Sequence, residues 1–179
     1  HPHPTLWRVD SAGLEQLTPG AHSINNHSWF PDEIDQSRGC SLAVANGTAF
    51  FTLESTTDSS QTGLWRSDGT PEGAFLLKET QSTIDGRPPD ALYPAENFVF
   101  FFISTSDGDE GLWRSDGTSA GTMLIQQWPL DGSASLSVEV AAILENRLLF
   151  ILHYDDRHEL WVSDGTPGGA QKLTTSPFL

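Results

Sequence analysis

The sequence is poor in cysteine, in basic residues and in long apolar runs. Cys40 is the only cysteine among 179 residues, so the chain cannot form an internal disulfide and must be stabilised by burial of side chains. Lys and Arg number 9 against 24 Asp and Glu, a net charge of -15, which disfavours nucleic acid and anionic lipid as partners. No apolar run approaches the ~18 residues of a membrane-spanning helix, so no membrane insertion is expected.

Familiar catalytic motifs are absent as well. The sequence contains no nucleophile elbow, no zinc-protease His-Glu-x-x-His motif, no phosphate-binding P-loop and no dinucleotide-binding glycine pattern. Helix start and stop signals are nearly missing, and no stretch shows a sustained period of 3.6 residues. These absences favour an all-β fold and a protein that acts by binding rather than by catalysis.

One short motif is present several times. The string GLWRSDGT begins at Gly63 and again at Gly111, and a variant, ELWVSDGT, begins at Glu159. Successive copies are 48 residues apart (63, 111, 159), and a weaker copy starts at Leu6 with LWRVD. A repeat of this length is typical of propellers and solenoids.

Each repeat predicts four antiparallel strands separated by turn signals. Leu112 and Trp113 are neighbours in one such strand, so their side chains must point to opposite faces of the sheet. One is expected to pack on the preceding sheet and the other on the following sheet. Asp116 and Gly117 then turn the chain. The octet is therefore predicted to be scaffold, which leaves function to residues that do not recur.

These repeats resemble the bacterial ELWxSDGT-type repeats, in which an Asn-centred turn, an aromatic pair and an acidic loop precede the octet. The resemblance covers the three full copies well and residues 6–17 weakly. It implies blades of a β-propeller in large secreted or surface-associated proteins, and it implies no particular chemistry.

The predicted architecture is a β-propeller-like array of four-stranded antiparallel blades, about three and a half to four of them, in one domain over 1–179. An irregular extra strand is expected near Ile24–Phe30. The predicted parts are a half blade at 5–18, a link at 19–40, and blades at about 41–79, 90–127 and 137–175. Three modes of closure follow: a compact four-bladed ring, part of a larger propeller in a longer chain, or an open array closed as a homo-oligomer.

Function is expected at the end of the blades opposite the repeated turns, because variable loops on a rigid scaffold usually carry binding sites. Aromatic rings beside carboxylates suit sugar rings, so the partner is predicted to be a glycan or an extracellular protein. A natural His1 terminus implies signal-peptide cleavage, other proteolysis or trimming of the chain, and signal-peptide cleavage is the preferred interpretation, which predicts a secreted or cell-surface protein. The candidate ligand-binding residues are Trp29, Trp128, His27, Asp155 and Asp156.

Two cation sites are also candidates. Asp107, Asp109 and Glu110 gather carboxylates in one loop, which suits calcium as an assisting ion. His1 and His3 are candidate copper ligands, so the alternative function is a copper- or other metal-binding protein or metalloenzyme that also uses loop histidines. A further alternative is a structural surface module that associates with itself through its incomplete blade.

Overall fold

The structure, a computed structural model, describes residues 42–55, 62–80, 89, 91–104, 110–129 and 136–177, together with the backbone of 7–10, 13–16 and 22–24. In these ranges the chain forms strands and turns and no helix, which confirms the all-β fold class. The N-terminal strands are β1 (Trp7–Asp10), β2 (Gly13–Gln16) and β3 (His22–Ile24).

Twelve further strands form three antiparallel meanders. The first sheet contains β4 (Leu42–Ala45), β5 (Thr48–Ser55), β6 (Gly63–Ser67) and β7 (Phe75–Glu79). The second contains β8 (Tyr93–Pro94), β9 (Val99–Ser104), β10 (Glu110–Ser115) and β11 (Met123–Trp128). The third contains β12 (Leu136–Leu144), β13 (Arg147–Tyr154), β14 (Arg157–Ser163) and β15 (Ala170–Pro177). The strands of these sheets span nearly the ranges expected for three blades.

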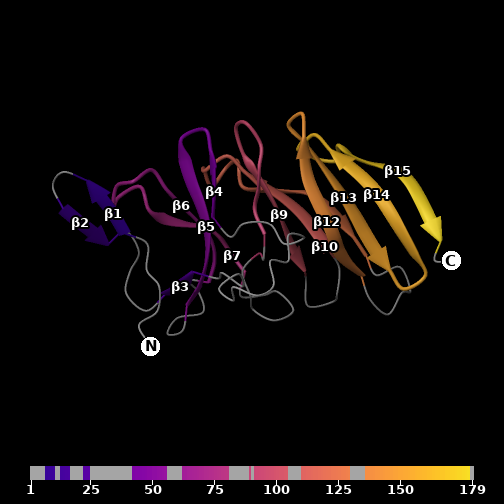
Figure 1. The fold of residues 1–179 in the computed structure, drawn as a ribbon, viewed down its shortest axis with the longest axis horizontal. Coiled ribbons are helices and arrows are strands. Elements are labelled where there is room, and N and C mark those ends of the chain that lie inside the picture. The colour runs from indigo at the N-terminus through magenta and orange to yellow at the C-terminus, as the bar shows by residue number, and fades with distance from the viewer. Residues whose placement is uncertain are drawn as a thin grey trace, which may run out of the picture.

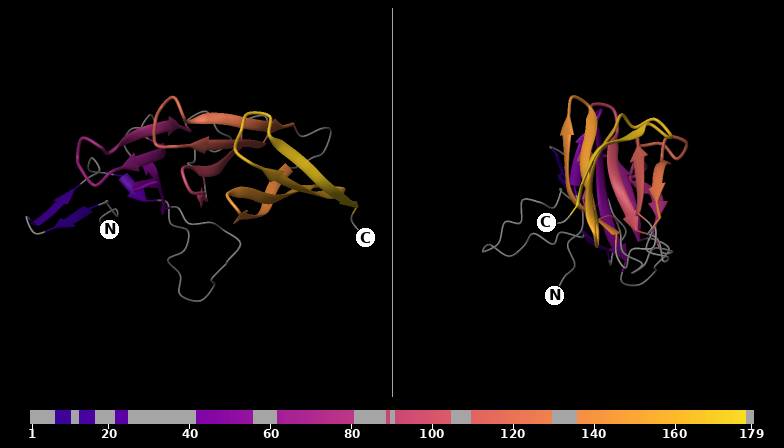
Figure 2. Two further views of the ribbon diagram at one scale, coloured as in Figure 1. Left: turned by 90° about the horizontal axis from the view of Figure 1, so that it is seen from above. Right: turned by 90° about the vertical axis from the view of Figure 1, so that its right-hand side faces the viewer.

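The sheets follow one another along an arc (Figure 1). Strands β1 and β2 form a separate two-stranded sheet at one end of this arc, and the third sheet lies at the other end (Figure 2). The described strands thus form an open stack, in which successive sheets pack face to face.

The first sheet also contains β3, a strand that comes before the other four in the chain. Strand β4 pairs with the first half of β5, and β3 pairs with its second half, where Ile24 lies opposite Leu53. An extra strand is thus present at His22–Ile24, and it shares only Ile24 with the predicted range, whose residues 25–30 lie outside the described residues. It satisfies backbone groups of β5 that β4 is too short to reach.

The octet holds neighbouring sheets together as its strand geometry predicts. Leu64 of the first sheet and Trp113 of the second belong to one apolar cluster between these two sheets. Leu112 of the second sheet and Trp161 of the third belong to the next cluster. In both of these interfaces the leucine faces the following sheet and the tryptophan faces the preceding one.

The aromatic pair on the second strand of each sheet works in the same way. Phe100 and Phe101 are neighbours on β9, and both are fully buried because one lies in each of the two clusters. The ring of Phe101 stacks on Trp113, with 6.4 Å between centroids, and Phe150 stacks likewise on Trp161 at 6.5 Å. Each such buried side chain contributes about 1.5–3 kcal/mol, so these interfaces carry much of the stability.

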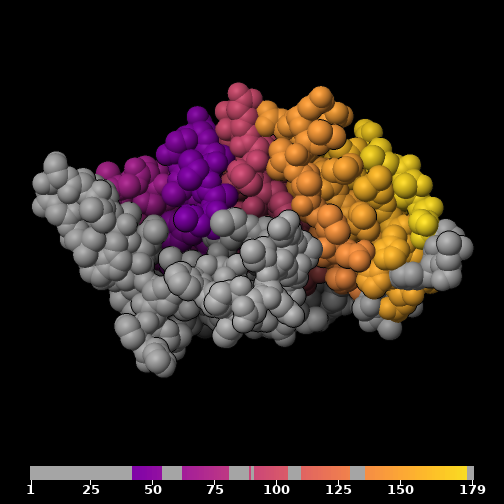
Figure 3. Space-filling view, in the orientation of Figure 1, coloured from indigo at the N-terminus to yellow at the C-terminus, as the bar shows by residue number. Residues whose placement is uncertain are grey.

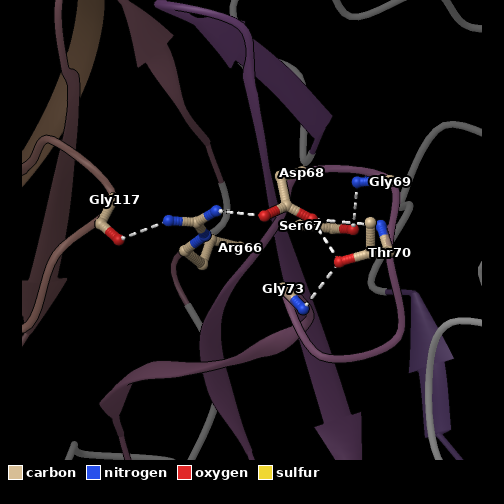
Figure 4. A network of polar contacts seen from close by, with 7 residues as sticks. All are labelled: Arg66, Ser67, Asp68, Gly69, Thr70, Gly73 and Gly117. Atoms are coloured by element: carbon tan, nitrogen blue, oxygen red, sulfur yellow. Dashed lines mark hydrogen bonds and ion pairs between the residues drawn. The ribbon is translucent and has the colours of Figure 1, made fainter.

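The SDGT part of the octet forms a hydrogen-bonded turn (Figure 4). In the first copy, Asp68 Oδ1 accepts hydrogen bonds from the Thr70 backbone N–H at 3.0 Å and from its hydroxyl at 2.7 Å. The Thr70 hydroxyl oxygen in turn accepts from the Gly73 N–H at 3.0 Å, and Ser67 Oγ accepts from the Gly69 N–H at 3.0 Å. A side chain at residue 73 would overlap the Asp68 carboxylate, which explains the glycine five residues after the aspartate.

The arginine of the octet reaches from one sheet to the next. Arg66 Nη1 donates a hydrogen bond to the carbonyl oxygen of Gly117, in the turn of the following sheet, at 3.2 Å (Figure 4). The same guanidinium pairs with Asp68 at 3.2 Å and lies 5.2 Å from the ring centroid of Phe75. The third copy has Val162 at this position, so it cannot make the equivalent contact.

A second polar contact links the turns of neighbouring sheets. The Glu96 N–H donates to Asn146 Oδ1 at 2.7 Å, and Asn146 Nδ2 donates to Glu96 Oε2 at 2.8 Å. Asn146 adopts a left-handed backbone with φ of 64°, as asparagine tolerates in tight hairpin turns. This contact ties the β8–β9 turn to the β12–β13 turn, at the opposite end of β13 from its connection to β14.

Candidate functional site

The non-recurring polar residues of the described chain gather around the β13–β14 hairpin. Its two-residue turn is Asp155-Asp156, and both residues are exposed. The Arg157 guanidinium lies over the ring of Tyr154, 3.8 Å from its centroid, and donates to Asp156 Oδ1 at 2.9 Å. The hairpin therefore has two exposed carboxylates on its turn, and Arg157 contacts this turn through Asp156.

Glu159 lies at the centre of this arrangement. Its side chain is 6% exposed and accepts hydrogen bonds from Arg157 Nε at 3.0 Å, Lys172 Nζ at 3.2 Å and Trp161 Nε1 at 3.1 Å. Burial alone would raise the pKa of Glu159, but these three donors outweigh it, and the pKa lies below its usual value. The hydrogen bond to Glu159 in turn is the largest cause that raises the pKa of Arg157. We define the hairpin network as Tyr154, Asp156, Arg157, Glu159 and Lys172.

The sequence analysis missed Glu159, although the sequence contains a signal for it. Glu159 occupies the position that Gly63 and Gly111 hold in the other copies of the octet. At Gly63 a Cβ would overlap the backbone carbonyl of Lys78, whereas the third sheet has room for a full side chain. This departure from the repeat at a buried position thus coincides with the charge network of the third sheet.

Two histidines lie beside the hairpin network. His153 and His158 are opposite each other on β13 and β14, and their rings stack with 4.8 Å between centroids. His158 Nε2 lies 3.3 Å from Glu139 Oε2 on β12. Among the residues that the structure describes, no group of three or more His, Cys, Asp or Glu could hold a metal ion. The predicted copper ligands His1 and His3 lie outside the described residues.

The predicted calcium loop is described only at its last residue. Glu110 is 6% exposed, and its Oε1 accepts a hydrogen bond from the Ser104 hydroxyl at 2.6 Å, which joins β10 to β9. The structure thus gives Glu110 a contact within its own sheet. Asp107 and Asp109 lie outside the described residues, so calcium stays a prediction.

The tryptophan expected to bind a ligand lies in the core instead. Trp128 is 4% exposed and packs edge-on against Phe150 at 5.4 Å and Trp161 at 5.2 Å between centroids. It fills the junction between the second and third sheets, which corrects the expectation that its ring is open to a sugar. Trp29 and His27 lie outside the described residues.

No protein-family profile and no curated protein sequence matches this chain. The structure is similar to crystal structures of puromycin hydrolase, with a TM-score of 0.55, and of its serine-to-alanine mutant complexed with PGG, with a TM-score of 0.54. The fold is β-propeller-like. In both cases 97% of this chain matches 24% of the hydrolase chain at 13% identity, so the chain spans about a quarter of these relatives.

This similarity concerns the fold alone, because sequence identity of 13% carries no site residues across. No helix within the described ranges has the length and apolar character needed to span a membrane.

Proposed function

We propose that this chain is a secreted, non-catalytic binding module that recognises a protein partner with basic groups through the loop end of its third sheet. The observation that carries this proposal is the hairpin network. A satisfied, partly buried set of charges holds Asp156 at an exposed turn, next to Asp155. Preorganised charges of this kind bind at a smaller entropic cost than mobile ones do.

The scaffold supports the same proposal by elimination. In the described copies, the tryptophan, serine and aspartate of the octet, together with the leucine of the first two copies, take part in apolar packing or in the turn. Sequence variation is then left to the loop end, where a rigid scaffold can change its ligand without changing its core.

The charge balance favours a basic partner over a glycan. The Asp156 side chain is 72% exposed even though it pairs with Arg157, and the whole chain has a net charge of -15. Such a surface attracts cationic groups and speeds their association. With Trp128 in the core, the case for sugar stacking depends on Trp29, and an assisting calcium ion depends on Asp107 and Asp109.

A binding assay with a Lys/Arg-rich peptide tests this proposal. The double variant Asp155→Asn/Asp156→Asn should weaken binding about 3- to 10-fold, the effect of two exposed charges worth roughly 0.3–0.7 kcal/mol each. Binding should also weaken as salt increases, because exposed charges are screened.

Glu145→Gln is the matched control, because Glu145 is an exposed acid with an ion pair of its own to Arg147 at the opposite end of β13. Equal losses in the control and the double variant would show that only net charge matters and would contradict a site at the hairpin. Saturable binding on a neutral glycan array that neither variant changes would replace the basic partner by a glycan.

A further inference from the structure

The third sheet has one face that no described residue covers. Opposite positions across its strands place Val140 next to Ile151, and Leu160 next to Ile151 from the other side. Leu149 lies in the next row on the same face, between Ala142 and Val162. We call this set the outer face: Val140, Ala142, Leu149, Ile151, Leu160 and Val162. Val140 is 44% exposed, and the others are exposed or half-buried.

The equivalent face of each other sheet is buried by its neighbour. Leu160 of the outer face corresponds to Leu64 and Leu112 in the octet, and both of these are fully buried. Leu149 corresponds to Phe50 and Phe100, because all three lie one residue before the partner of the octet tryptophan, and both phenylalanines are fully buried. The outer face is thus the continuation of an interface that the molecule builds twice.

The residues of the outer face suit burial better than contact with water. In stacked repeats, a sheet face that stays in contact with water normally carries polar residues. Here Val162 replaces the arginine of the first two copies, of which Arg66 reaches the next sheet, and this makes the face more apolar. Contiguous apolar patches of this type mark interaction surfaces.

The two established interfaces show what fits this face. In both, the leucine face of one sheet receives the tryptophan face of the next. The tryptophan face of the first sheet is not available, because Phe51 and Leu53 are fully buried and Trp65 is 4% exposed. The remaining tryptophan of the octet pattern is Trp7, on β1 at the far end of the arc.

Strands β1 and β2 match the last two strands of a full sheet. Trp7 lies opposite Gln16 on β2, as Trp65 lies opposite Leu76 on β7. The two-stranded sheet and the outer face lie at opposite ends of the molecule (Figure 2), and the space-filling view shows the third sheet at one extremity (Figure 3). One end of the molecule therefore has a sheet that carries the octet tryptophan, and the other end has a leucine face with no such sheet beside it.

We propose that the outer face of the third sheet docks on the β1–β2 sheet of a second copy of this chain, head to tail. The contact repeats the leucine-to-tryptophan packing of the interior. A head-to-tail contact joins two different surfaces, so copies close into a ring or extend as a filament, depending on the rotation between them. The net charge of -15 on each copy opposes the contact, so salt strengthens the association.

Light scattering on the purified chain in low salt and in about 1 M salt, where the screening length is ~3 Å, tests the proposal. The wild-type chain should assemble, and more strongly in high salt. Val140→Asp should abolish assembly, and Ala142→Lys should do the same at a second exposed position. Leu124→Asp is the matched control, because Leu124 is 38% exposed on the middle sheet and should assemble like the wild type.

A mixing experiment distinguishes head-to-tail docking from contact between two outer faces. Trp7→Asp alone should be monomeric, as should Val140→Asp alone. An equimolar mixture should form dimers, because one variant retains an intact outer face and the other an intact β1–β2 sheet. Circular dichroism and unfolding midpoints check that each variant folds.

Three results would overturn the proposal. The first is a wild-type chain that stays monomeric in high salt at its highest soluble concentration. The second is a folded Trp7→Asp variant that assembles like the wild type, which would indicate contact between two outer faces. The third is loss of assembly in Leu124→Asp to the same degree as in Val140→Asp.

Discussion

Replacing Leu112 and Leu160 by alanine, one at a time, makes the same chemical change at two equivalent positions of the repeat. Leu112 is fully buried between the second and third sheets, in contact with the cluster that contains Phe150 and Trp161. Leu160 is half-buried on the outer face of the third sheet. The two variants therefore differ in whether a neighbouring sheet covers the side chain.

The expected losses follow from burial. At Leu112 the variant loses the transfer energy of the removed carbons and leaves a cavity, and such changes cost about 3–4 kcal/mol. At Leu160 part of the side chain already contacts water and no closed cavity forms, so the loss should be about 1 kcal/mol. For a chain of this length 1 kcal/mol shifts Tm by about 2–4 °C, so the two variants should differ by about 4–12 °C.

Urea unfolding followed by tryptophan fluorescence, with calorimetry in parallel, measures both losses. The chain should be kept dilute and in low salt, so that association between copies does not stabilise the wild type at Leu160. Equal losses for Leu112→Ala and Leu160→Ala would refute the reasoning, because they would show that the outer face is already covered within one chain.

Three other outcomes follow from the turns. Gly121→Ala should cost about 1–2 kcal/mol in urea unfolding, since its Cβ would overlap the Asp116 carboxylate; no loss would contradict the close approach. Arg66→Met should cost about 1 kcal/mol by removing the hydrogen bond to Gly117. An unchanged midpoint of urea unfolding would show that this hydrogen bond does not stabilise the fold. Hydrogen bonds from the neighbouring threonine lower the pKa of Asp164, so its stabilising effect is present at neutral pH and disappears as pH falls below about 4. Asp164→Asn should therefore flatten the acid side of a Tm-against-pH curve, and an unaltered curve would count against this role.

Much of the scaffold could be predicted from the residues. The octet places Leu112 beside Trp113, and alternation along a strand sends them to opposite faces whatever the rest of the chain does. The glycine five residues after each octet aspartate, such as Gly73, recurs for an equally local reason. The aspartate carboxylate occupies the space that a side chain would need there. Because the local geometry is the same in each copy of the octet, it could be predicted from the repeated sequence.

The candidate site was harder to predict because its contacts join residues distant in sequence. Lys172 reaches Glu159 from the next strand, and Asn146 reaches Glu96 from the next sheet. Trp128 was also placed wrongly from the sequence. Its position outside the repeat suggested that it is exposed, but its ring is buried between two sheets. Spacing along the chain does not report which side chains a curved stack brings together.

The amino-acid sequence by itself determined the blade: four short strands, a leucine and a tryptophan on opposite faces, and a turn built from SDGT. These features depend on neighbours within a few residues, where covalent geometry limits the choices. Only the tertiary structure decided which blade faces are covered, that β3 joins the first sheet and that Glu159 carries a charge network. Those outcomes depend on packing between sheets, which is set by the shape of the whole stack.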